Sequence, residues 1–129
     1  LQHLWDCGVR TIVNLEEGWN LLNPFIYRNA EADWKAMGGT YFRFGRSNIF
    51  PAYRGELLSC DLLIERSAYK GKVYVHCFAG VDRTGEQIAF CQVMKGDDPQ
   101  DAWDDAENNG MHLQYRLFWK RSFMRECRE

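Results

Sequence analysis

One short segment of the chain contains the residue types needed for covalent chemistry at phosphorus. It reads HCFAGVDRTG from His76 to Gly85, so Arg83 follows Cys77 by six positions. A cysteine thiolate is a good nucleophile, and the planar guanidinium of an arginine can hold two phosphoryl oxygens at once. Backbone N–H groups of a tight loop can point at the same oxygens. The spacing therefore predicts a phosphate-binding cup made by Arg83 and the residues before it, which are Phe78, Ala79, Gly80, Val81 and Asp82.

The cup has to lie between a strand and a helix. Lys72 to His76, which follows Gly71, predicts a strand, and the stretch from about Thr84 to Lys95, ended by Gly96, predicts a helix. The N-terminus of that helix then faces the cup, where its dipole and unpaired N–H groups favour an anion. Such surroundings also favour the thiolate form of Cys77. We expect Thr84 to donate its hydroxyl to the sulfur, and His76 to orient the loop through a hydrogen bond.

Strands and helices alternate through the rest of the chain. Strands are predicted for Val9 to Leu15 and for Thr40 to Phe44. Helices are predicted before Cys7-Gly8, over Ala30 to Met37, and from the Asp98-Pro99 cap to Phe123 with a break near Asn109-Gly110. A further helix is predicted to run to about Tyr69, with one apolar face made by Leu57, Leu58, Leu62, Leu63 and Ile64. This order predicts an α/β fold in which helices flank a central, mostly parallel sheet. At 129 residues the chain has room for one domain, spanning 1–129.

Composition and charge argue against a nucleic-acid-binding protein, a membrane-spanning segment, a disulfide framework and a zinc site. The net charge of −2 gives no electrostatic basis for binding nucleic acid, and no apolar run is long enough to span a bilayer. The five cysteines are odd in number and form no C-x-x-C pair, which argues against a disulfide framework or a zinc site and favours a reducing cytoplasm. We expect Cys7, Cys60 and Cys91 to be small buried hydrophobic residues and Cys127 to be exposed.

The segment His76-Cys77-x5-Arg83-Thr84-Gly85 resembles the signature of the cysteine-based protein tyrosine phosphatases, especially small dual-specificity and atypical bacterial or phage-like members. The resemblance implies a two-step hydrolysis, in which the thiolate attacks phosphorus to give a phosphocysteine and water then hydrolyses it. It implies no metal and no other cofactor. The stretch Gly8 to Leu15 also resembles an early strand of these enzymes. Because they have a further strand before it, and the chain opens on Leu1, we expect an N-terminally trimmed domain.

The resemblance is incomplete at the general acid. These enzymes use an aspartate on an upstream loop to protonate the leaving oxygen, and the matching position here is Asn48, which cannot supply a proton. No Asp or Glu occurs from Trp34 through Gly55. Three explanations stay open. Asp82 is the acid, as proposed for myotubularin-like lipid phosphatases; or the acid has been replaced and the enzyme is slow; or Asn48 is native and only good leaving groups are hydrolysed. We favour the first.

The resemblance implies a phosphomonoester substrate, foremost a phosphotyrosine protein or peptide, with some phosphoserine or phosphothreonine. Two alternatives remain. One is a weakly active or inactive relative that binds phosphoproteins, for which Asn48 is the only support. The other is a phosphoinositide phosphatase, which the absence of lysine from the cup disfavours. Arg43, Arg46 and Arg54 lie near the expected acid loop, where they either contact an anionic substrate or form a solvated basic face.

Overall fold

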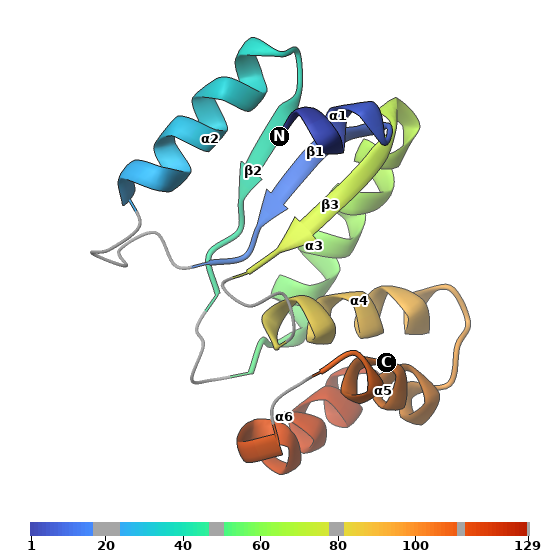
Figure 1. Ribbon diagram of the computed structural model, residues 1–129. Coiled ribbons are helices and arrows are strands. Elements are labelled where there is room, and N and C mark those ends of the chain that lie inside the picture. The colour runs from blue at the N-terminus through green and yellow to red at the C-terminus, as the bar shows by residue number, and fades with distance from the viewer. Residues whose placement is uncertain (17–23, 47–50, 78–81, 111–112, 129) are drawn as a thin grey trace.

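The computed structural model describes residues 1–16, 24–46, 51–77, 82–110 and 113–128. Within these ranges three strands, β1 (Val9–Asn14), β2 (Thr40–Arg43) and β3 (Lys72–His76), form one parallel sheet in the order β2-β1-β3 (Figure 1). Thr11 of β1 pairs with Thr40 of β2 and with Val73 of β3. The prediction of a mostly parallel sheet is confirmed.

Helices flank the sheet and continue beyond the carboxyl ends of its strands (Figure 1). In chain order they are α1 (Gln2–Asp6), α2 (Pro24–Ala36), α3 (Arg54–Ser67), the 3₁₀ helix η1 (Ala68–Lys70), α4 (Arg83–Met94), α5 (Pro99–Asn108) and α6 (Leu113–Glu126). Helix α2 begins at Pro24, well before the predicted start at Ala30, because proline is favoured at the first position of a helix. The predicted cap of α5 is present: the Asp98 side chain accepts hydrogen bonds from Gln100 N and Asp101 N.

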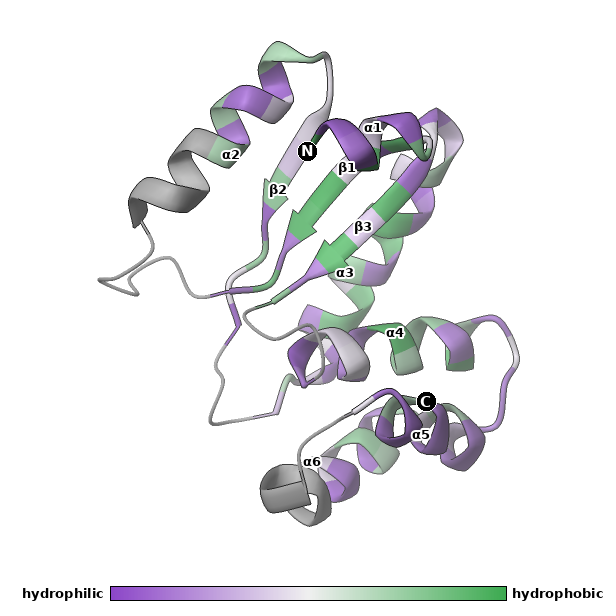
Figure 2. Cartoon of the chain, viewed as in Figure 1, coloured by the Kyte–Doolittle hydropathy of each residue, from purple (hydrophilic) through white to green (hydrophobic). Residues whose placement is uncertain are grey.

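The largest cluster of buried hydrophobic residues lies where α4, α5 and α6 meet α3. Phe90, Trp103, Trp119 and Phe123 are buried there and pack with Leu57. In Figure 2 β1 is largely hydrophobic and β3 alternates between hydrophobic and hydrophilic residues, whereas α5 is largely hydrophilic. Because protein interiors are close-packed, this helical layer gives α4 a rigid support beneath the carboxyl edge of the sheet.

Most of the aliphatic side chains predicted to share one face of α3 do pack into the core: Leu57 is buried, and Leu58, Leu63 and Ile64 are half-buried. Leu57, Cys60, Asp61 and Ser67 are buried, whereas Leu62 is 52% exposed. Residues three and four positions apart share one helix face, so Leu57, Cys60 and Asp61 point the same way and Leu62 points elsewhere. The prediction that Leu62 lies on the buried face is therefore wrong.

Candidate active site

The carboxyl ends of the three strands meet at one edge of the sheet, and the segments that leave them stay hydrogen-bonded to each other. Leu15 N donates to His76 O at 2.8 Å, and Arg46 N donates to Leu15 O at 3.0 Å. Open α/β sheets bind their ligands outside this edge. The residues that follow β1, β2 and β3 are therefore brought together where a ligand is expected.

Cys77 lies directly after β3 and is 6% exposed. Thr84, in the first turn of α4, donates its hydroxyl to the Cys77 sulfur at an Oγ1–Sγ distance of 3.1 Å. The strand and the helix predicted on either side of the cup are both present, and so is the predicted contact. A hydroxyl donor and a helix N-terminus both favour negative charge on the sulfur.

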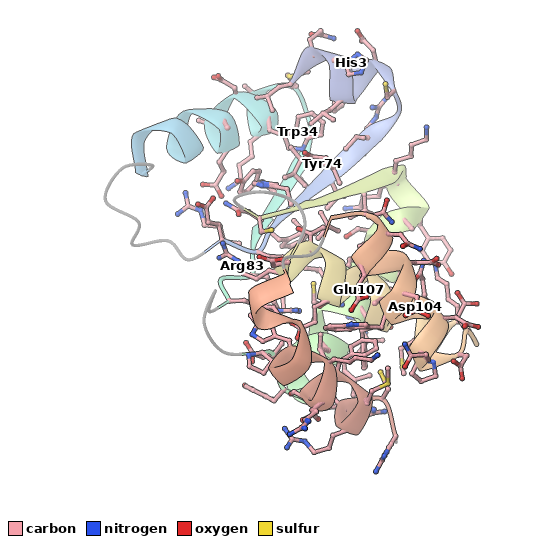
Figure 3. The ribbon with its side chains drawn as sticks, turned by 60° about the horizontal axis from the view of Figure 1, so that its bottom comes forward. His3, Trp34, Tyr74, Arg83, Asp104 and Glu107 are labelled. Atoms are coloured by element: carbon pink, nitrogen blue, oxygen red, sulfur yellow. The ribbon has the colours of Figure 1, made fainter. Side chains whose placement is uncertain are left out.

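Arg83 is the first residue of α4 and is 7% exposed (Figure 3). Its Nη1 donates to the backbone carbonyl of Arg46, 3.2 Å away. A guanidinium has several N–H donors, so this bond fixes the direction of the group and still leaves donors for a ligand. Because Arg83 and Thr84 are neighbours, one helical turn holds both the cation and the donor to the sulfur.

Some of the predicted site residues fall outside the described part of the chain: Asn48, Phe78, Ala79, Gly80 and Val81. Their roles stay predictions. Asp82 is described, and it is the half-buried N-cap residue of α4. Its backbone carbonyl accepts from Glu86 N at 2.9 Å. The structure therefore places Asp82 at the N-terminus of α4, directly before Arg83.

His76 ends β3 and stacks on Tyr74, with the ring centroids 5.6 Å apart. Its Nδ1 lies 3.5 Å from the carbonyl oxygen of Cys77. Burial lowers the pKa of His76, although the contact with Cys77 and the negative charge of Glu16 oppose this shift. Burial therefore favours the neutral form of the ring. A neutral ring beside the Cys77 backbone fits the predicted role of orienting the loop.

A buried carboxylate at the same edge was not predicted. Glu16 follows β1, is 5% exposed, and donates its backbone N–H to the Asn14 side chain at 2.9 Å. Within the described residues neither of its carboxylate oxygens has a hydrogen-bond partner. The sequence offered no signal for this burial, because the acidic pair Glu16-Glu17 after a strand is typical of an exposed turn.

The three arginines near the expected acid loop do not form one basic face. Arg43 pairs with Glu31 at 3.1 Å, Arg54 donates to the carbonyl of Glu126, and Arg46 is only 2% exposed. Neither predicted alternative, a substrate contact or a solvated face, fits Arg46. Its guanidinium points into the interior, where backbone and side-chain acceptors of α3 and α4 surround it.

Arg46 belongs to a buried polar network. It donates to the Gln87 side chain and to the carbonyl of Glu56 (3.2 Å), and its Nη1 lies 3.9 Å from a carboxylate oxygen of Glu86. Glu86 is 1% exposed, and burial raises its pKa to about 8, although Arg46 opposes the shift. The sequence held one signal for this network: Glu86 and Gln87 follow Arg83 by three and four positions, so they share its helix face.

The buried Glu86 carboxyl predicts a pH-dependent stability. Its pKa is about 8 in the folded chain against 4.5 for an ordinary glutamate, so the folded state holds the proton more tightly. The free energy of unfolding should therefore fall as the pH rises between these values, by at most about 1.4 kcal/mol per pH unit. Glu86→Gln should flatten that slope. Urea unfolding of both proteins across this range measures the difference, and parallel slopes would contradict the prediction.

The other cysteines differ in burial. Cys60 and Cys91 are buried as predicted, which raises their pKa to about 11 and about 12. Cys127 is half-buried rather than exposed, because it packs against the core at α4 to α6, and its pKa is raised to about 11. Cys7 is exposed, so the prediction of burial is wrong there; it follows α1, which buries no residue. The three thiols with raised pKa stay protonated at neutral pH and are poor nucleophiles.

The described ranges contain no group of three or more His, Cys, Asp or Glu side chains that could hold a metal ion. Among the helices of the same ranges, none combines the length and the apolar character that crossing a bilayer requires.

Solved structures share this fold at low sequence identity. Kinase-associated phosphatase, in a form whose catalytic-site cysteine is replaced by serine, matches with a TM-score of 0.78 and 14% identity over 98% of this chain and 72% of that chain. TpbA of P. aeruginosa matches with a TM-score of 0.71 and 19% identity, over 96% and 71%. Tk-PTP in its active form matches with a TM-score of 0.70 and 18% identity, over 92% and 78%. No protein-family model matches the sequence, and no curated protein is significantly similar to it.

Identities of 14% to 19% are too low to transfer an activity, but these TM-scores are those of a common fold. The matches extend over nearly all of this chain and over most of each neighbour. The chain therefore has the α/β fold of these solved structures, and the predicted protein-tyrosine-phosphatase-like fold is confirmed.

Proposed function

We propose that the chain hydrolyses phosphomonoesters through a phosphocysteine intermediate. The observation that supports this most strongly is the Oγ1–Sγ contact of 3.1 Å between Thr84 and Cys77, which joins the end of β3 to the first turn of α4. Arg83 in the same turn supplies a buried cation of fixed direction. A nucleophile, a helix N-terminus and a planar cation in one place suit a phosphoryl group.

The first step forms a sulfur–phosphorus bond and breaks the ester bond between phosphorus and oxygen. The Cys77 thiolate attacks phosphorus, Arg83 holds two non-bridging oxygens, and the leaving oxygen takes a proton from the general acid. In the second step a water oxygen attacks phosphorus and gives its proton to the same acid, now ionised. The sulfur–phosphorus bond breaks, and Thr84 donates to the sulfur as it regains its charge. The products are an alcohol or phenol and inorganic phosphate.

Asp82 is the proposed general acid. It lies at the N-cap of α4, beside the arginine that would hold the phosphoryl group. Residues 34–55, which include the expected acid position Asn48, contain no carboxylate side chain. A single carboxyl group that gives its proton in the first step and recovers it in the second keeps the proton balance of the cycle.

Phosphotyrosine in a protein or peptide is the proposed substrate, with phosphoserine and phosphothreonine as further substrates. TpbA has been solved in complex with pTyr, and this supports a phosphotyrosine ligand for the shared fold. Arg43 pairs with Glu31, and the Arg54 guanidinium donates to the backbone carbonyl of Glu126, so both are poorly placed to contact a multiply phosphorylated head group. PTPMT1 has been solved in complex with PI(5)P, and that structure matches this chain with a TM-score of 0.63. A phosphoinositide is therefore the competing substrate.

Asp82→Asn tests the general acid. We expect hydrolysis of a phosphotyrosine peptide to fall by about 10²–10⁴-fold, because its leaving group needs a proton. Hydrolysis of p-nitrophenyl phosphate should fall far less, because p-nitrophenolate is stable without one. Steady-state assays on both substrates measure the difference. Asp97→Asn, an exposed aspartate between α4 and α5, is the matched control and should leave both rates unchanged.

The outcomes of these assays separate the alternatives. Equal losses on both substrates would show that Asp82 supports the loop and gives no proton. Faster release of phosphate from PI(5)P than from the phosphotyrosine peptide by the unaltered chain would make the lipid the substrate. If the chain bound the peptide but hydrolysed none of these substrates, it would be a phosphoprotein-binding module and not an enzyme.

A further inference from the structure

We propose that Glu86 and Arg46 form a positioning pair that sets the direction of Arg83, an inference that rests on the proposed phosphatase function. Neither side chain is exposed to a substrate, because both are buried, with exposed fractions of 1% for Glu86 and 2% for Arg46. They would act through the backbone carbonyl of Arg46, which accepts the hydrogen bond from Arg83.

Residues of α4 bind the chain on both sides of Asn48, the expected position of the general acid: at Arg46 before it and at Ala52 after it. On the N-terminal flank, the Arg46 carbonyl accepts from Arg83 at 3.2 Å, and the Arg46 side chain donates to Gln87. On the other flank, Ala52 N donates to Glu86 Oε1 at 3.4 Å. Glu86 faces Arg46 as well, at 3.9 Å between Nη1 and Oε1. The same carboxyl group is therefore shared by the two flanks.

The buried charge of Arg46 makes this arrangement depend on Glu86. A guanidinium does not lose its proton in a protein, and a buried cation is costly unless an anion or acceptors compensate it. Within the described residues Arg46 Nε and Nη1 have no hydrogen-bond acceptor. When Glu86 is ionised, its attraction draws the guanidinium towards α4 and fixes the Arg46 backbone. When Glu86 is protonated, that attraction is lost, and the carbonyl that orients Arg83 is held less firmly.

The groups around Glu86 determine when it ionises. Arg46 stabilises the ionised form, whereas burial and the negative charge of Glu56 on α3 favour the protonated form, with a resulting pKa of about 8. From the end of α6 the Cys127 thiol also faces Glu86, and Arg54 of α3 acts on that thiol; with a pKa of about 11 it stays neutral. The hydrogen bond from Arg83 to the Arg46 carbonyl should therefore be held more firmly as the pH rises through about 8.

Binding of tungstate tests the pair without turnover, because this tetrahedral oxyanion, kept dilute enough not to condense, is a dianion at both pH values used. Tungstate is titrated by calorimetry into the Cys77→Ser protein with and without Glu86→Gln, at about pH 6.5 and about pH 9.5. Glutamine has the shape of protonated glutamate, so both proteins should bind equally at the lower pH. At the higher pH the glutamine protein should bind about 10-fold more weakly, as for one weakened charged hydrogen bond.

Two further variants separate positioning from stability. Phe90→Leu alters a buried core residue of the same helix, so it should lower stability and leave tungstate affinity unchanged. Arg46→Lys keeps the charge but lacks the planar fork, so it should weaken tungstate binding at both pH values. An effect of Glu86→Gln that is absent, or equal at both pH values, would overturn the positioning pair. Absence of tungstate binding by the Cys77→Ser parent would instead overturn the proposed function.

Discussion

Replacing Cys77 by serine should lower the turnover of p-nitrophenyl phosphate by about 10⁴-fold or more, while the cup still binds tetrahedral anions. A serine hydroxyl at this position can keep the hydrogen bond with Thr84, but it is far less ionised than a thiol and forms no phosphoserine at a useful rate. Arg83 would keep its bond to the Arg46 carbonyl, because that bond does not involve the sulfur. Long-incubation assays measure residual turnover, and titration with a phosphotyrosine peptide measures the binding that remains.

Cys7→Ser is the matched control, because it makes the same chemical change at an exposed position after α1. It should retain the full rate. Substantial turnover by Cys77→Ser would show that a different group attacks phosphorus. Cys60 and Cys91 are unsuited to that role, because burial raises their pKa to about 11 and about 12.

Changing Arg83 to lysine should lower kcat/KM for a phosphotyrosine peptide by about 10²–10³-fold, comparable to the loss of a transition-state hydrogen-bond donor. The guanidinium can donate to the Arg46 carbonyl at 3.2 Å and still present a planar pair of N–H groups to phosphoryl oxygens. A lysine ammonium is a single donor centre and cannot reproduce this geometry. Steady-state measurement of kcat and KM shows where the loss falls, and we expect kcat to fall because the clamp acts in the transition state.

Arg43→Lys is the control for this substitution. Arg43 is exposed and pairs with Glu31 at 3.1 Å, so the change should leave kcat/KM close to that of the parent. If Arg83→Lys were as active as the parent, the guanidinium would not be the phosphate clamp. A loss confined to KM would show that Arg83 binds the substrate without stabilising the transition state.

The strands and the surroundings of the cup could be predicted because their signals are local. Gly71, the strand residues after it and the loop that follows them are visible within a few positions, and the structure has β3 at Lys72–His76. The start of α2 was misplaced because Asn23-Pro24 fits both a loop and the first turn of a helix. Local sequence does not separate these two uses of proline.

The network behind the site could not be predicted, because burial depends on segments that are far apart in the chain. Arg46 and Gln87 are hydrogen-bonded although 41 positions separate them. In the sequence Arg46 looks like a loop cation and Gln87 like a surface residue of a helix, yet both are buried. The exposure of Leu62 has the same origin, since it depends on which side of α3 the rest of the fold covers.

Detection of a phosphoryl group on Cys77 during turnover is the most direct test of the proposed chemistry. The chain is mixed with p-nitrophenyl phosphate, whose fast first step favours accumulation of the intermediate, quenched in acid at short times and analysed by peptide mass spectrometry. We predict that the peptide containing Cys77 gains the mass of one phosphoryl group, and that the Cys77→Ser protein shows no such species. Turnover accompanied by phosphate on another residue, or by no phosphorylated Cys77 at any quench time, would contradict the phosphocysteine mechanism.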